Sequence, residues 1–174
     1  MFNVFLENEW EVKMAELSLS KIGRTAKMAV IGAVKGTGDI AESVLEATKD
    51  VLMVTVEGAT EVAVAAEKAV GQVVAGAVAA AADAGEDVGK AIKSAVKGTV
   101  KGASEVGADV SKTAVAAVDG AVNAAGEIGA DTAKALEQAT TGAIEAAEEI
   151  GTDTAEAVRN VLKTAVKGKD KSSD

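Results

Sequence analysis

One short motif recurs along this chain at a fixed interval. It reads Glu-Ile-Gly-Ala-Asp-Thr-Ala at 127–133, Glu-Ile-Gly-Thr-Asp-Thr-Ala at 149–155, and Glu-Val-Gly-Ala-Asp-Val-Ser at 105–111. The three starts are 22 residues apart both times. Twenty-two residues over six turns is about 3.67 residues per turn, the 11-residue period that keeps one face of a nearly straight or slightly right-handed helix in line. The spacing therefore predicts a long helix with an 11/22-residue repeat.

The composition favours extended helices over a compact core of large side chains. Hydrophobic residues make up 48% of the 174 residues, yet only three residues are aromatic and proline is absent. Without proline a helix can continue for many turns, and Ala and Val fill little volume in a close-packed core. We therefore expect an all-α fold of very long amphipathic helices, arranged as an elongated hairpin, a helical bundle or a right-handed coiled coil.

The missing residue types exclude most catalytic chemistry. The chain has no Cys and no His, which removes the usual zinc ligands and the Ser-His and Cys-His nucleophile pairs. We expect a protein that is not an enzyme, with no catalytic residues, no metal site and no cofactor.

Charge and hydropathy limit the partners. The net charge of −9 argues against nucleic acid, and no apolar run reaches the roughly 18–20 residues that span a bilayer. Lys21, Arg24 and Lys27 precede a short apolar run that loosely imitates a signal peptide, but Lys35 closes it. We expect an intracellular chain, soluble or surface-associated, with no transmembrane span.

Five regions follow along the chain. Residues 1–13 hold all the aromatic residues and form either a docking arm or an upstream extension before a true start at Met14. A short basic helix and a break are expected at 14–38, and a long helical segment with breaks near 85 and 98 at 39–102. Residues 103–167 are predicted to form one long helix carrying the 22-residue repeat, and 168–174 a polar tail.

On that long helix the larger apolar residues share one broad face. The face is expected to pack on other helices or to meet an apolar surface, because the opposite side is charged. Its members are Val106, Val110, Ile128, Leu136, Ile144, Ile150, Val158 and Leu162.

Glycines recur at the same helical phase, as Gly107, Gly129 and Gly151. A glycine inside a helix is about 1 kcal/mol less favourable than alanine, so their recurrence needs a reason. One interpretation is close packing against another backbone, as in small-residue helix contacts. The alternatives are tolerance of small residues and local turns that divide the helix.

Four lysines, Lys90, Lys93, Lys97 and Lys101, lie at helical spacing on one face. This stripe predicts contact with an anionic partner, such as a lipid headgroup or an acidic segment. The alternative is an exposed face that pairs with Glu or Asp elsewhere in the assembly.

Residues 56–62 and 67–78 resemble the 11-residue Gly/Ala/Val/Thr/Lys repeats of synucleins. More loosely, residues 39–167 are similar in kind to granule-coating phasins and to late-embryogenesis-abundant proteins. The resemblance implies helix formation on an apolar surface, no catalysis, and a free chain that can be disordered.

We expect a non-enzymatic structural or scaffolding protein that self-associates through its Ala/Val/Gly-rich helices into a homo-oligomer. The first alternative is an amphipathic coat of a lipid membrane, a droplet or a polymer granule surface. The second is a stress-protective protein that is disordered when free.

Overall fold

The helices account for nearly all of the described chain. The computed structural model describes residues 21–36, 39–57 and 62–170, so the predicted N-terminal arm at 1–13 and the end of the tail lie outside it. Within these ranges there is no strand, and the prediction of an all-α fold is confirmed. The helices are residues 21–36, α2 (Ile40–Glu57), α3 (Val62–Asp83), α4 (Val88–Glu105), α5 (Val110–Glu127), α6 (Thr132–Ile150) and α7 (Thr152–Asp170).

The helices are short, and the prediction of very long ones is wrong. From α2 to α7 they contain 18 to 22 residues each, and the stretch 103–167 holds the end of α4, all of α5 and α6, and most of α7. The period of 22 is an 18-residue helix plus a four-residue turn, since α4 begins at Val88 and α5 at Val110. Eighteen residues complete five helical turns, so each new helix starts with its apolar face in the same phase.

A glycine and an aspartate build each of the three turns between α3 and α6, as the link between α4 and α5 shows. Gly107 adopts φ +74°, and the amide of Ala108 donates to the carbonyl of Ala103 at 2.9 Å, which closes the C-terminus of α4 in a Schellman-type pattern. Two residues later the Asp109 carboxylate accepts from the amide of Lys112 at 3.0 Å and caps α5. The same pair of devices recurs as Gly85 with Asp87 and as Gly129 with Asp131.

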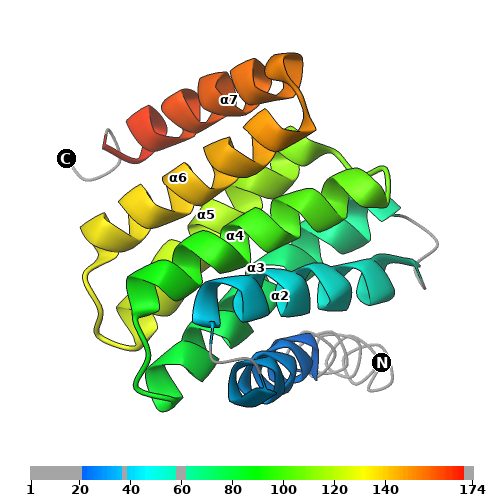
Figure 1. Cartoon of the computed structure of the whole chain (residues 1–174). Helices are drawn as coiled ribbons and strands as arrows, with labels where there is room; N and C mark the ends of the chain where they lie inside the picture. The colour runs from blue at the N-terminus through cyan, green and yellow to red at the C-terminus, as the bar shows by residue number, and fades with distance from the viewer. Residues whose placement is uncertain (1–20, 37–38, 58–61, 171–174) are drawn as a thin grey trace, which may run out of the picture.

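The helices form two layers, because each packs on the second helix along the chain as well as on its neighbour. We call α2, α4 and α6 the even layer; they lie side by side in Figure 1. The odd layer contains the 21–36 helix, α3 and α5 (Figure 1). At the C-terminal end α7 covers both α5 and α6. The chain thus zigzags between layers and advances by one helix at each turn.

Small side chains fill the space between the layers. Leu52 and Ile92 are the largest of the fully buried side chains, and the remainder of that core is almost entirely Ala and Val. The predicted break near 98 does not exist, because Gly98 is buried in the middle of α4. The chain does turn near 85, between the end of α3 and the start of α4.

Candidate functional site

Four glycines that the sequence analysis did not single out form the contacts within each layer. Gly76, Gly98, Gly120 and Gly142 are also 22 residues apart, one in each of α3 to α6. A Cβ atom on Gly98 would overlap the carbonyl oxygen of Leu45 in α2, and one on Gly142 would overlap the carbonyl oxygen of Lys93 in α4. Each layer is therefore joined backbone to backbone. We call each such contact a glycine joint.

The odd layer has the same joints. A Cβ on Gly76 would overlap the carbonyl oxygen of Gly23, and one on Gly120 would lie 2.8 Å from the Cα of Gly71. Because these obstacles are backbone atoms, they cannot move aside without moving a helix. These glycines share the 22-residue spacing in the sequence. Their role in packing can be recognised only when the helix boundaries are known, because the boundaries place them inside helices.

The glycines predicted for close packing do something else. Gly107 and Gly129 have φ values of +74° and +73° and end helices, and a Cβ at either would meet nothing within 4 Å. Gly151 is extended, with φ 165°, and forms the one-residue link from α6 to α7. The prediction of close packing at these three positions is therefore wrong, and the alternative of local turns that divide the helix is confirmed.

The predicted apolar face is likewise divided among several elements. Val106, Ile128 and Ile150 lie at helix ends, and the latter two are 40% and 36% exposed. Val158 and Leu162 in α7 are buried. The other three members of the predicted face are half-buried: Val110 in α5, and Leu136 and Ile144 in α6. A single stripe along one helix was the wrong prediction because the turns reverse the chain three times within it.

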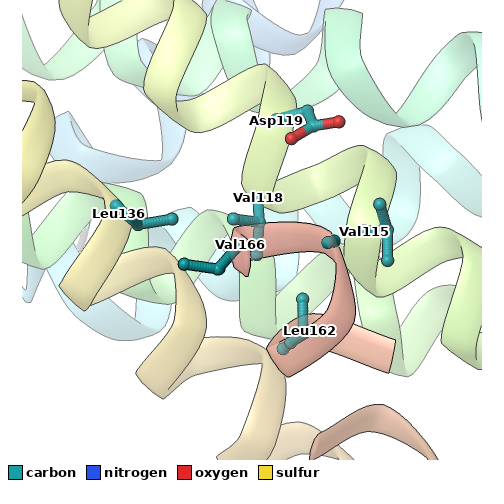
Figure 2. Close-up of a pocket in the computed structure, with 7 residues that line it drawn as sticks. Val115, Val118, Asp119, Leu136, Leu162 and Val166 are labelled. Atoms are coloured by element: carbon teal, nitrogen blue, oxygen red, sulfur yellow. The ribbon is translucent and has the colours of Figure 1, made fainter. Parts of the chain in front are cut away.

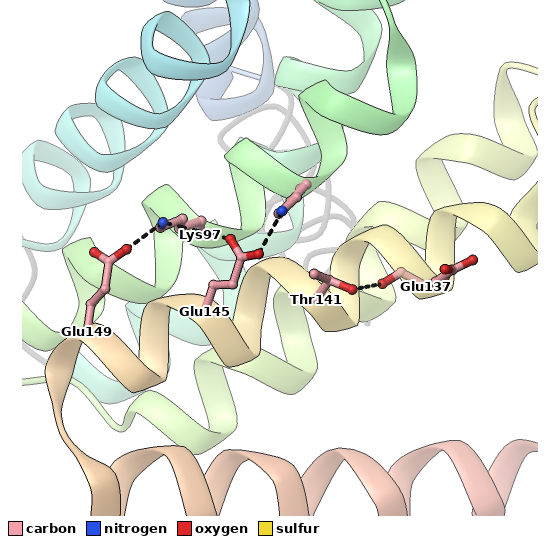
Figure 3. Close-up of polar contacts among 6 residues, drawn as sticks. Lys97, Glu137, Thr141, Glu145 and Glu149 are labelled. Carbon is pink, nitrogen blue, oxygen red and sulfur yellow. Dashed lines mark hydrogen bonds and ion pairs between the residues drawn. The ribbon is translucent and has the colours of Figure 1, made fainter.

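Three of the four predicted stripe lysines form ion pairs within the chain, which follows the alternative interpretation. Lys97 reaches Glu149 of α6 at 2.5 Å (Figure 3). Lys93 reaches Glu145 at 2.7 Å, and Lys101 also pairs with Glu149. Lys90 is exposed. The stripe thus joins α4 to α6 beside the glycine joint.

The ion pair from a lysine to an acid two helices later recurs along the array. Lys27 meets Asp83 at 2.5 Å, and Lys49 meets Glu105 at 3.0 Å. These pairs occupy the same place in their helices as Lys97 and Glu149, because α2 starts 48 residues before α4 and α4 starts 44 before α6. One electrostatic contact therefore repeats in both layers.

These ion pairs shift the pKa of two groups, Glu149 and Lys49. Hydrogen bonds from Lys101 and Lys97 lower the pKa of the Glu149 carboxyl below its usual 4.5. The hydrogen bond to Glu105, with the charge of that carboxylate, raises the pKa of Lys49 above its usual 10.5. Both shifts favour the charged forms.

Two of the hollows among the described helices lie on the even layer and beside α7. A groove of about 240 Å³ lies on the even layer, and its two lysines, Lys49 and Lys101, are already paired with Glu105 and Glu149. A smaller apolar cavity of about 60 Å³ lies between α7 and the α5–α6 pair, where Leu162 faces Val115 and Val118 (Figure 2).

The joint to α7 departs from the pattern. Thr164 stands 22 residues after Gly142, so α7 has a threonine where α3 to α6 have the joint glycine. The Thr164 hydroxyl donates to the carbonyl of Asn160 in its own helix at 3.0 Å, and Thr164 is exposed. The residues of α7 that line the cavity are instead Leu162, Ala165 and Val166, so α7 meets α5 and α6 there through larger side chains.

The N-terminal end of the array is more apolar on its surface. Met28 in the 21–36 helix and Val54 in α2 are both 73% exposed, the highest values among the large hydrophobic residues of the described chain. Within the described ranges no group of three or more potential metal-binding side chains occurs, and none of the described helices is long and apolar enough to cross a membrane.

Comparison with models of protein families found no match, and comparison with curated protein sequences found none either. Among solved structures, the chain is similar to a de novo designed helical repeat protein, DHR7. The sequences are 20% identical over 90% of this chain and 95% of that chain, with a TM-score of 0.42. This similarity is too weak to indicate a function.

Proposed function

We propose that this protein is a non-enzymatic structural scaffold that self-associates. The observation that carries the proposal is the repeated glycine joint, which builds a stack of helices whose order and spacing are fixed by backbone contact. Repeat architectures of this kind depend on contacts between successive units and present extended surfaces and two open ends. Such ends suit association with further copies or with other proteins.

The burial of the Ala/Val faces supports a scaffold over a coat. A lipid or granule coat needs an apolar helix face that is free to meet acyl chains or polymer. Ala117 and Ala121 of α5, and Ala139 and Ala143 of α6, are fully buried against other helices of the same chain. A coat would have to open these contacts first.

Sedimentation velocity with far-UV circular dichroism on the full chain tests the proposal. Over a dilution series without lipid, we expect high helicity at every concentration and a sedimentation coefficient that rises with concentration. The same samples with neutral vesicles should show no further helix and no vesicle-bound protein. A chain that is unfolded in buffer and helical only on vesicles would instead establish the coat.

A further inference from the structure

The interior helices show what the N-terminal end lacks. In α4, Gly98 and Gly102 contact α2 and Glu105 pairs with Lys49, so these three positions face the helix two places earlier. In α3, Gly76 and Asp83 face the 21–36 helix in the same way, and Ala80, the residue 22 before Gly102, lines a small cavity with residues of that helix. The positions 48 residues earlier must therefore face away from the array at its N-terminal end. They are Met28, Gly32 and Lys35 in the first helix, and Asp50, Val54 and Glu57 in α2.

This N-terminal face, defined by those six residues together with Lys21, Arg24 and Glu46, has an apolar centre. Lys35 and Glu46 stand at its border, because Lys35 also lines a small cavity beside α3 and Glu46 also lines the even-layer groove. Met28 and Val54 are mostly exposed, and a Cβ on Gly32 would meet nothing within 4 Å. In the interior the positions that match Met28, Gly32 and Val54 are Gly76, Ala80 and Gly102, and all three are buried. The face thus has the shape of an unfilled helix-packing surface.

Its charges are separated by helix. All four charged residues of the 21–36 helix are basic, whereas α2 carries four acidic residues and one lysine. Lys27 and Lys49 are occupied by pairs with Asp83 and Glu105. The charged residues that remain on the face are all exposed: Lys21, Arg24 and Lys35 on the first helix, and Glu46, Asp50 and Glu57 on α2.

We propose that the N-terminal face binds the same face of a second copy, as a two-fold dimer in which the 21–36 helix of each copy lies antiparallel on α2 of the other. If the two-fold axis is parallel to the helices, the basic 21–36 helix of each copy faces the acidic α2 of the other, so the favourable contact occurs twice. A two-fold axis in the interface perpendicular to the helices would instead place the two basic 21–36 helices against each other, which is unfavourable. Charge therefore selects one of the two arrangements.

The register of the two helices agrees with this arrangement. The Ser43 hydroxyl donates to the Ala33 carbonyl, which places these two residues side by side in the antiparallel pair. Counting away from that contact by equal numbers of residues, Lys21 is level with Thr55 and Arg24 with Leu52, so they lie two residues, about 3 Å along the helix axis, from Glu57 and Asp50. The two-fold axis preserves these levels, so Lys21 and Arg24 each lie within side-chain reach of a carboxylate of the partner.

The area fits a dimer that dissociates on dilution. Two helices about 24 Å long and about 10 Å wide offer roughly 500 Å² on each copy. The total of about 1,000 Å² lies at the lower limit of specific interfaces. The proposal rests on the proposed self-association and names the surface responsible for it.

Two charge-reversed variants test the dimer. One carries Lys21→Glu, Arg24→Glu and Lys35→Glu, and the other carries Glu46→Lys, Asp50→Lys and Glu57→Lys. Each should raise the dimer dissociation constant by about 100-fold or more, because like charges then face each other across the interface. An equimolar mixture should recover a 1:1 heterodimer, measured by sedimentation velocity and native mass spectrometry. Recovery on mixing also shows that both variants are folded.

The remaining outcomes are distinct. A matched reversal at the opposite end, Lys134→Glu with Glu137→Lys on exposed positions of α6, should leave the wild-type dissociation constant unchanged. Association that persists in both N-terminal variants, or variants that stay monomeric when mixed, would overturn this interface and leave the scaffold proposal standing. A wild-type chain that is monomeric at every concentration would overturn both, and would point to coverage of the face by residues 1–20 of the same chain.

Discussion

The α4–α6 joint and the α3–α5 joint each contain a glycine at the same position of the repeat, but they differ in the charged residues beside it. Gly142 lies on the backbone of Lys93 and Gly120 on that of Gly71. Beside the first joint three lysines pair with Glu145 and Glu149. The second has Ala75 and Ala79 where α4 has Lys97 and Lys101. The comparison teaches that backbone contact is the shared element of the array and that the ion pairs are an addition.

The largest effect should come from filling a glycine joint. Gly142→Ala and Gly120→Ala should each lower the free energy of unfolding by about 2–3 kcal/mol, because the new methyl overlaps backbone atoms of the neighbouring helix. Urea unfolding followed by circular dichroism measures the change.

Gly71→Ala is the matched control across the same joint. A Cβ there meets nothing within 4 Å, so the higher helix propensity of alanine should stabilise the protein by about 0.5–1 kcal/mol. If Gly120→Ala were as stable as Gly71→Ala, the backbone contact would not control packing.

The turn glycines should give the next largest effect, equally in both layers. Gly107→Ala and Gly129→Ala should each destabilise by about 1–2 kcal/mol, since φ near +74° is unfavourable for an L-residue. Gly151→Ala, at an extended φ, should change stability by less than about 0.5 kcal/mol. Equal losses at all three positions would contradict this assignment of turn conformations.

Acid should remove the contribution that the Glu149 ion pairs make to the stability of the α4–α6 joint. Because the folded-state pKa of Glu149 lies below its unfolded value, its pairs stabilise the protein above pH 4.5 and that contribution is lost as the pH falls through the folded pKa. Glu149→Gln should therefore be less stable than wild type at pH 7, by less than about 1 kcal/mol, and equal to it in strong acid.

Glu127→Gln is the control, since Glu127 is the residue of α5 equivalent to Glu149, and α3 has Ala75 at the position equivalent to Lys97. It should match wild type at both pH values in the same urea titrations. A deficit of Glu149→Gln that persisted in strong acid would mean that something other than charge is lost.

The smallest effect should come from adding, at the α3–α5 joint, the ion pair that Lys97 and Glu149 form at the α4–α6 joint. Ala75→Lys places an ammonium where Lys97 stands in α4, within reach of Glu127, and should stabilise by a few tenths of a kcal/mol. About 1 M NaCl should cancel the gain. Ala75→Gln, which has similar length and no charge, separates the effect of charge from that of packing.

The sequence was sufficient to predict helices and the absence of a core of large side chains. It was ambiguous about length, because a 22-residue period fits both six turns of one helix and a five-turn helix with a four-residue turn. The pair Gly107 and Asp109 could have decided it, since glycine at a helix end followed two residues later by a capping aspartate marks one helix stopping and the next starting.

The joints could not be found from the sequence. Gly98 and Gly107 look alike as glycines in an Ala/Val context, and only the fold places the first against the carbonyl of Leu45 and the second in a turn. Likewise Lys97 and Glu149 are far apart in the chain, and their contact depends on the layer to which each helix belongs.

The alternation between layers restricts how a gene for this chain can grow. Duplication of 22 codons would add one helix and move every later helix into the opposite layer. The lysines of α4 would then stand on different layers from the glutamates of α6. Duplication of 44 codons would return each later helix to its own layer and keep both kinds of contact. Lengths that differ by pairs of helices are therefore the ones that preserve the array.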